Sequence, residues 1–178
     1  MRLKGTEALF ALLSKASNRR LVEALTDTGV EFVIIGGVAL AYYGFRDPFE
    51  VDDLDLLLEA NKRTAEAVTS TLSALIPHSL VLESTIRPGT KLMLRDTFYA
   101  DLIFAETTER ALDIINGSTL VTDGGTRLRL ASVDRLRIMK EQVIKEFREQ
   151  LRKLERDTKE FQEKLEKHER DLDALKAA

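Results

Sequence analysis

The chain has 178 residues, of which 44% are hydrophobic and 32% charged, and its net charge of −3 gives no global signal for nucleic acid, although a local basic patch stays open. Because it has no cysteine and only two histidines, we exclude disulfides, thiolate zinc sites and cysteine nucleophiles, and we do not expect a histidine-based metal site. The N-terminus shows no signal-peptide pattern and no apolar run approaches the length of a membrane span, so we expect a soluble, cytoplasmic protein with no membrane partner.

Two helices are predicted at the N-terminus, over residues 6–15 and 18–28, because apolar residues recur there at helical spacing. Thr6 and Asn18 are suitable N-cap residues for these helices. Gly29 is suited to end the second helix as its C′ residue. The two segments are therefore expected to be separate helices with a short connection.

Residues 32–58 contain the pattern on which the functional interpretation depends. A short apolar run, Phe32 to Ile35, is typical of a buried strand, and two glycines, Gly36 and Gly37, follow it directly. A small-residue helical turn comes next, and a loop that contains Arg46 then leads to a second apolar strand. We therefore predict a unit of strand, glycine pair, helix and strand.

Two carboxylates, Asp53 and Asp55, lie in this second strand with one residue between them. Residues i and i+2 of a strand project from the same face, so both carboxylates point the same way. Leu54, Leu56 and Leu58 then point the other way, into a core. Two acids on one face of an apolar strand repel each other unless a cation lies between them, and the usual solution is a hard divalent cation bound through oxygen.

The chain from residue 61 to residue 131 is expected to complete a mixed α and β domain. The patterns predict helices over 61–75 and 107–115, strands over 78–83, 91–94 and 97–104, and a hairpin of strands 119–122 and 127–130. Asn61 is a good cap for the first of these helices, and Asp123-Gly124-Gly125 suits the turn of the hairpin.

Asp101 is a third candidate carboxylate, because it interrupts the apolar strand 97–104. Taken alone, an acid in a strand is more often an edge or surface residue. Together with Asp53 and Asp55 the interpretation changes, because three carboxylates on neighbouring strands make a two-metal phosphoryl-transfer arrangement. The glycine pair supports this, since glycines let phosphate approach the backbone and the free N–H groups at a helix start attract it.

Residues 132–178 are predicted to form one long helix, because no Gly or Pro occurs there and apolar residues follow a heptad pattern. Oppositely charged residues at i and i+4 support the helix. At about 1.5 Å per residue it would run on the order of 60 Å, too long to pack entirely on a domain of this size. It is expected to pair with a second copy, with a partner, or with itself by folding back. We therefore divide the chain into a domain, 1–131, and a coiled-coil-like segment, 132–178, for oligomerisation or partner binding.

The glycine pair Gly36-Gly37, the acidic pair Asp53-Leu54-Asp55 and the later acid Asp101 resemble the nucleotidyltransferase family of the polymerase-beta type. The resemblance covers roughly residues 30–140. It implies an α+β fold, a small mixed sheet with flanking helices, and the long C-terminal α-helix predicted from the heptad pattern would follow it.

One branch of that family is most similar to this chain, namely the bacterial branch that contains abortive-infection and toxin–antitoxin nucleotidyltransferases. The features shared with it are the Gly-Gly-Val-Ala-Leu form, with Gly44 and Arg46 before the acids, and a strand end that leads into a helix carrying Lys140. The chain departs from the branch in two respects. The segment from Arg46 to Asp52 is longer and has no Ser or Thr before the acidic pair. The lysine-aspartate cluster that often follows the helix lysine has its nearest match at residues 167–173, where heptad-flanking charge explains the residues as well.

The resemblance implies an enzyme that transfers a nucleoside monophosphate from an NTP to a hydroxyl acceptor, with release of pyrophosphate. Asp53, Asp55 and Asp101 are implied to hold Mg²⁺ or Mn²⁺, and Asp101 also to accept the proton of the acceptor hydroxyl. Gly36 and Gly37 are implied to cradle the β- and γ-phosphates.

Arg46 and Lys140 are the further nucleotide-binding candidates, although a lysine at a helix start is a solvated surface group in most proteins. Arg87 and Lys91, which flank a turn near the third acid, are weaker candidates. Tyr42 and Tyr43 follow the glycines, and either stacking on a base or packing explains them.

Three functional hypotheses follow. The first is an active nucleotidyltransferase with tRNA, a protein or a small molecule as acceptor, in a toxin–antitoxin or phage-defence role. The second is a catalytically silent module of the same fold, such as an antitoxin, that binds and oligomerises through residues 132–178. The third is an assembly element, with a homodimer expected through the same helix. Retention of all three acids favours the first.

Overall fold

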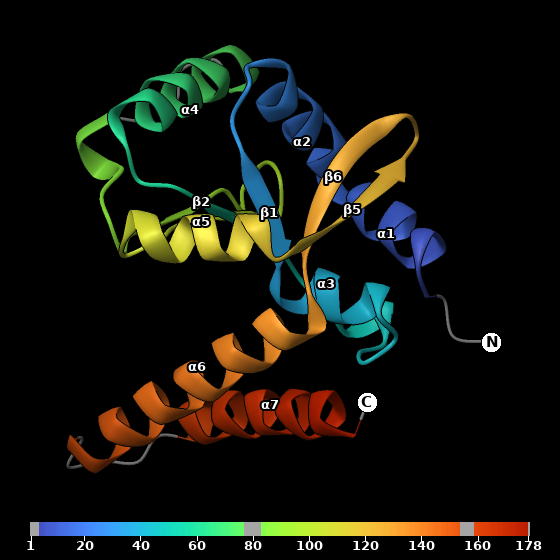
Figure 1. Ribbon diagram of the computed structural model, residues 1–178, viewed down its shortest axis with the longest axis vertical. Helices are drawn as coiled ribbons and strands as arrows, with labels where there is room; N and C mark the ends of the chain where they lie inside the picture. The colour runs from blue at the N-terminus through green and yellow to red at the C-terminus, as the bar shows by residue number, and fades with distance from the viewer. Residues whose placement is uncertain (1–3, 77–82, 154–158, 178) are drawn as a thin grey trace. The chain divides into compact units, whose positions relative to one another are not determined.

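The computed structural model describes residues 4–76, 83–153 and 159–177, and the chain divides into two compact units, Met1–Ala131 and Ser132–Ala178. The first unit contains a six-stranded mixed sheet with helices around it (Figure 1). The second unit contains the long helix α6 (Val133–Lys153) and a further helix, α7 (Lys159–Lys176). The expected fold class, a mixed sheet with flanking helices and a long C-terminal helix, is confirmed.

Two helices of the first unit precede the first strand, and the other three lie between strands along the chain. They are α1 (Thr6–Leu13), α2 (Asn18–Asp27), α3 (Gly36–Tyr42), α4 (Lys62–Leu75) and α5 (Thr108–Asn116). Short 3₁₀ turns lie at Lys15–Ser17, Pro48–Glu50 and Glu83–Thr85. None of the helices in the described ranges is both long and apolar enough to cross a membrane.

Two predicted N-caps are wrong by one residue. The N-cap of α1 is Gly5, so Thr6 is already helical, and the N-cap of α2 is Ser17, so Asn18 lies inside the helix and is buried. The end of α2 is as predicted, because Gly29 has a φ of 70° and the next N–H, of Val30, donates to the carbonyl of Leu25 at 3.0 Å.

The sheet has the strand order β3-β4-β2-β1-β6-β5. The strands are β1 (Phe32–Ile35), β2 (Leu54–Leu58), β3 (Lys91–Met93), β4 (Ala100–Phe104), β5 (Ser118–Asp123) and β6 (Thr126–Ala131). Pairs β2–β4 and β1–β6 are parallel, and the other pairs are antiparallel. This order places the two strands that carry the candidate acids, β2 and β4, side by side in the middle of the sheet.

The predicted strands are found with altered boundaries. The predicted strand 97–104 begins at Ala100, because residues before it form the turn that connects β3 to β4. The hairpin of β5 and β6 closes around Gly124 and Gly125, as predicted, with Asp123 paired to Thr126. The predicted strand 78–83 lies almost entirely outside the described residues, and its last residue begins a 3₁₀ turn.

The main core lies on one face of the sheet. Leu54, Leu56 and Leu58 of β2 are fully buried there, against apolar residues of α1, α2 and α4. Helix α5 contacts β1 and β6, and its buried residues lie outside this core cluster, so α5 is on the opposite face, where Figure 1 draws it in front of the strands. The alternation of β2 is therefore as predicted: leucines enter the core while Asp55 faces the other way.

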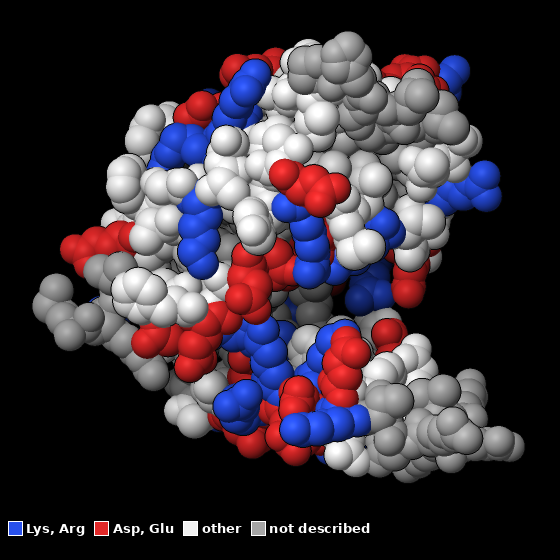
Figure 2. Space-filling view, turned by 180° about the vertical axis from the view of Figure 1, so that it is seen from behind, with Lys and Arg blue, Asp and Glu red and all other residues white. Residues whose placement is uncertain are grey.

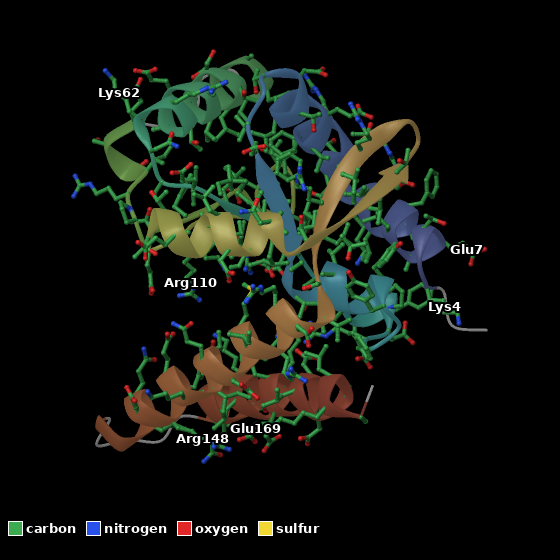
Figure 3. The ribbon with its side chains drawn as sticks, viewed as in Figure 1. Lys4, Glu7, Lys62, Arg110, Arg148 and Glu169 are labelled. Atoms are coloured by element: carbon green, nitrogen blue, oxygen red, sulfur yellow. The ribbon has the colours of Figure 1, made fainter. Side chains whose placement is uncertain are left out.

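The second unit corrects the expectation of one uninterrupted helix from Ser132 to Ala178. Helix α6 ends at Lys153, α7 begins at Lys159, and the two pair in antiparallel fashion. Ion pairs join them, from Lys140 to Asp171 at 2.7 Å and from Arg148 to Glu169 at 2.7 Å, and the second pair is labelled in Figure 3. Of the three pairing modes that the heptad pattern left open, folding back is therefore the one present.

Residues of the heptad pattern form the contact between α6 and α7, and aromatic rings are part of it. The rings of Phe147 and Phe161 lie 4.6 Å apart between their centroids, and His168 packs edge-on against Phe147. Leu172 and Leu175 are buried as well. The apolar stripe is thus covered within the chain itself, so it no longer requires a second copy. Pairing with a partner or in a homodimer stays a prediction.

We predict that Lys140→Met lowers the free energy of unfolding by about 3 kcal/mol, because it leaves the buried carboxylate of Asp171 without its ion pair. The measurement is urea denaturation followed by circular dichroism. The matched control, Arg148→Met, breaks the exposed pair with Glu169 and is expected to change stability by less than about 1 kcal/mol. Equal losses of unfolding free energy in both variants would contradict the conclusion that the Lys140–Asp171 pair is buried and the Arg148–Glu169 pair exposed.

Candidate metal and nucleotide site

Three carboxylates from two separate segments of the chain converge at one end of β2 and β4. Asp53 directly precedes β2, Asp55 lies in β2, and Asp101 lies in β4. The parallel register pairs Asp55 with Asp101, so the two side chains project from the same face of the sheet. One carboxylate oxygen from each of the three residues lies within 4.8 Å of the others. The structure therefore brings together the three acids that the sequence singled out.

The three acids differ in burial. The side chain of Asp101 is fully buried, whereas those of Asp53 and Asp55 are partly exposed. An ionised carboxylate without solvent costs several kcal/mol unless hydrogen bonds or opposite charges compensate it. Asp101 therefore requires cations within contact distance.

Two basic residues supply this charge, Arg95 and Lys91. The Nη2 atom of Arg95 donates to Asp101 Oδ2 at 2.9 Å and to Asp53 Oδ2 at 2.7 Å, and Nε donates to Asp101 Oδ1 at 3.3 Å. Lys91 forms an ion pair with the same Asp101 Oδ2. Arg95 thus bridges two of the three acids, and Lys91 contacts one.

These contacts determine the ionisation of the site. Burial alone would raise the pKa of Asp101, but hydrogen bonds from Arg95 and Lys91 outweigh burial, and the pKa lies below its usual value. The hydrogen bond to Asp101 also raises the pKa of Arg95. Asp101 is therefore an anion at neutral pH.

The β3–β4 hairpin explains how the two cations reach Asp101. The register pairs Met93 with Asp101, so Lys91, two residues earlier on β3, lies diagonally opposite on the same face. Arg95 follows in the turn, where the N–H of Leu94 donates to the carbonyl of Ala100 at 2.8 Å. Sequence reasoning missed Arg95 and ranked Lys91 low. The available signal was the hairpin itself, since pairing the two strands places both cations beside the acid.

Gly36 is required by its contact with the acidic cluster. It has a φ of 64°, in the region that favours glycine, and a Cβ atom at this position would overlap Oδ2 of Asp55. The antiparallel pairing of Ile35 with Asp55 creates this proximity. The first residue of α3 therefore packs directly against one of the acids.

Gly37 makes room for Arg46. A Cβ atom on Gly37 would lie 2.9 Å from Nη1 of Arg46, whose side chain is buried. The guanidinium of Arg46 thus lies against Gly37. Its role in nucleotide binding stays a prediction.

The other predicted binding residue, Lys140, belongs to the second unit. Its ammonium pairs with Asp171 at 2.7 Å and lies 3.0 Å from Nδ1 of His168. Its assignment to the nucleotide site also stays a prediction. Asp171 belongs to the segment 167–173, in which heptad-flanking charge was one explanation of the charged residues. In the structure, however, the carboxylate of Asp171 is buried and pairs with Lys140.

The tyrosines after the glycines have packing contacts. The hydroxyl of Tyr43 donates to Thr119 Oγ1 at 3.0 Å, and the Tyr42 and Tyr43 rings meet edge-on at 5.2 Å. Packing is therefore the better explanation for Tyr43.

On the face drawn in Figure 2, the Lys and Arg side chains of the described residues lie among Asp and Glu side chains and form no extended basic region. This agrees with the small net charge of −3 and gives no independent signal for a nucleic-acid interface on that face.

The fold is nucleotidyltransferase-like. Among solved structures, the chain is similar to the crystal structure of an antigenic nucleotidyltransferase-like protein from Paracoccidioides brasiliensis, with a TM-score of 0.53 and 17% sequence identity. The match covers 97% of this chain and 77% of that one. At this identity the likeness supports the fold. No family model and no curated protein matches the sequence.

We predict that Gly36→Ala destabilises the protein by about 2 kcal/mol or more, because strained backbone and overlap with Asp55 add together. The matched control is Gly125→Ala, which has a φ of 86° but no atom within 4 Å of the added Cβ. It should lose only the backbone contribution, about 1 kcal/mol. Urea denaturation measures both variants, and equal losses would argue against close packing of Gly36 on the acid.

Proposed function

We propose that the protein is a metal-dependent nucleotidyltransferase that moves a nucleoside monophosphate from an NTP to a hydroxyl acceptor. The observation that carries the proposal is the convergence of Asp53, Asp55 and Asp101 within 4.8 Å, directly beside a glycine pair, on a nucleotidyltransferase-like fold. Three carboxylates and an adjacent side-chain-free backbone are what metal-assisted phosphoryl transfer needs.

The donor set fits a hard divalent cation. Carboxylate oxygens about 2.1 Å from one Mg²⁺ lie up to about 4.2 Å apart, so the oxygens, which lie within 4.8 Å of one another, need only small side-chain rotations. Mn²⁺ accepts the same oxygen ligands. When bound, the cation would neutralise charge on the triphosphate and on the reacting phosphoryl group.

Other residues of the site would then bind the phosphates and accept the proton of the acceptor hydroxyl. Gly36 and Gly37 place backbone directly beside Asp55 and Arg46, and by the family resemblance this segment is proposed to receive the phosphates, with Arg46 as a nearby positive charge. The lowered pKa of Asp101 suits an ionised metal ligand better than a general base while Arg95 and Lys91 remain bound to it. We therefore assign Asp101 first to metal binding, and to proton transfer only after these ion pairs change.

The acceptor is proposed to be tRNA or a protein, in the cytoplasm and in a toxin–antitoxin or phage-defence role. The support is the similarity of the Gly-Gly-Val-Ala-Leu segment, Gly44 and Arg46 to the bacterial abortive-infection branch. The α6–α7 hairpin, Ser132–Ala178, is proposed as the surface for a partner or a second copy.

One observation favours a second candidate, a catalytically silent binding module. Arg95 and Lys91 already pair with Asp53 and Asp101, so two of the three acids have opposite charge beside them without a metal ion. A chain that only binds a partner would be stable in this form.

We predict that the protein transfers label from an α-³²P NTP to a defined species in cell extract with Mg²⁺ present. The double variant Asp53→Asn/Asp55→Asn should lose about 100-fold or more of this activity, because it removes two ligand charges. The matched control, Asp27→Asn at the exposed end of α2, should keep full activity.

All four NTPs are tested separately, and Mg²⁺-dependent NTP binding is measured in parallel by isothermal titration calorimetry. Absence of both transfer and metal-dependent binding with every NTP would rule out the enzyme and leave the binding module. Transfer that persists in the double variant would show that these acids are not the catalytic centre.

A further inference from the structure

Arg95 lies between two of the proposed metal ligands. A single atom, Nη2, is 2.7 Å from Asp53 Oδ2 and 2.9 Å from Asp101 Oδ2. Both residues belong to the cluster whose oxygens lie within 4.8 Å of one another. The guanidinium therefore takes the place between the carboxylates that a shared cation would need.

The arginine and a metal ion cannot both use these oxygens in this arrangement. A lone pair that accepts a hydrogen bond from Arg95 is not available to a metal ion, and two positive charges a few ångströms apart repel each other. A divalent cation that bridges Asp53 Oδ2 and Asp101 Oδ2 would occupy the position of Nη2, so binding there requires the guanidinium to leave.

The two sides of this contact differ in mobility. Asp101 is fully buried on a central strand, so its position is fixed by the sheet. Arg95 lies in the β3–β4 turn with 51% of its side chain exposed, so its long side chain has solvent beside it into which it can rotate. The arginine is therefore the group that moves.

Lys91 has a different place in the cluster. It pairs with Asp101 but not with Asp53, and its ammonium is a point charge that cannot form the forked contacts of a guanidinium. If Arg95 leaves, Lys91 can still compensate the buried carboxylate. The site thus has one bridging cation and one that stays with a single acid.

We propose that Arg95 competes with the divalent cation for Asp53 and Asp101 and, once displaced, binds the triphosphate of the nucleotide. Guanidinium groups bind phosphate through paired hydrogen bonds, so the triphosphate offers Arg95 a replacement for the carboxylates. Metal and nucleotide then bind with positive coupling. The metal ion frees Arg95 to bind the triphosphate, and the triphosphate holds Arg95 away from the carboxylates that bind the metal. The nucleotide half rests on the proposed function, whereas the competition with metal does not.

The first test titrates Mn²⁺ into the full-length protein without nucleotide, by isothermal titration calorimetry. Arg95→Met should bind Mn²⁺ about 10-fold more tightly than the wild type, because the competing cation is gone. Arg95→Lys keeps the charge but cannot reproduce the forked contacts, and should fall between the two. The control is Arg110→Met on α5, labelled in Figure 3, which removes an arginine whose ion pair is local, with Glu106 at 2.9 Å. This variant should leave Mn²⁺ binding unchanged.

The second test repeats the titration with a saturating NTP analogue that has a non-hydrolysable α,β-methylene bond. The wild type should gain about 10-fold in Mn²⁺ affinity from the analogue beyond any gain seen in Arg95→Met. An equal gain in both proteins would overturn the nucleotide half. Mn²⁺ affinity in Arg95→Met equal to or weaker than in the wild type would overturn the competition.

These outcomes separate the inference from the proposed function. Tighter Mn²⁺ binding in Arg95→Met, combined with no nucleotidyl transfer by the wild type, supports the competition and contradicts the enzyme. Transfer by the wild type without a change in Mn²⁺ affinity contradicts the competition and supports the enzyme. If neither protein binds Mn²⁺, the competition is overturned, and the enzyme is then judged by the transfer assay and by metal-dependent NTP binding.

Discussion

The structure of the site depends on one constraint, the ionised carboxylate of Asp101 in a fully buried position. Such a group is stable only with opposite charge and hydrogen bonds around it. The β3–β4 hairpin meets this need by directing Lys91 and Arg95 to the carboxylate, and Arg95 extends the contact to Asp53. The neighbouring elements of the site are arranged around this charge balance.

The same constraint links the sheet to the chemistry. The leucines of β2 occupy the main core on one face, so its acids face the other way, where the parallel pairing of Asp55 with Asp101 aligns them. Gly36 then follows β1 against Asp55, and Gly37 leaves room for Arg46. Strand register therefore makes the cluster of carboxylates and the glycine after β1 neighbours, and the loop that carries Arg46 adds a buried arginine beside them.

The sequence predicted the features of the site that depend on neighbouring residues in the chain. It did not predict contacts between distant segments, or a helix break that no Gly or Pro marks. Period-two patterning in β2 and the glycine pair identified the acids, since these are short-range features. Arg95 was missed because its contact with Asp53 depends on the pairing of three strands. The hairpin of α6 and α7 was not resolved because residues 132–178 contain no Gly or Pro, and a heptad stripe fits self-pairing and pairing between chains equally well.

The central claim is that Asp53, Asp55 and Asp101 form one metal site. The most direct measurement is anomalous X-ray diffraction from crystals grown with Mn²⁺ and a non-hydrolysable NTP analogue. The account predicts anomalous density about 2.2 Å from oxygens of the three carboxylates, with the guanidinium of Arg95 moved away from Asp53. Density elsewhere, or an Arg95 that still bridges Asp53 and Asp101 with no metal between the acids, would contradict it.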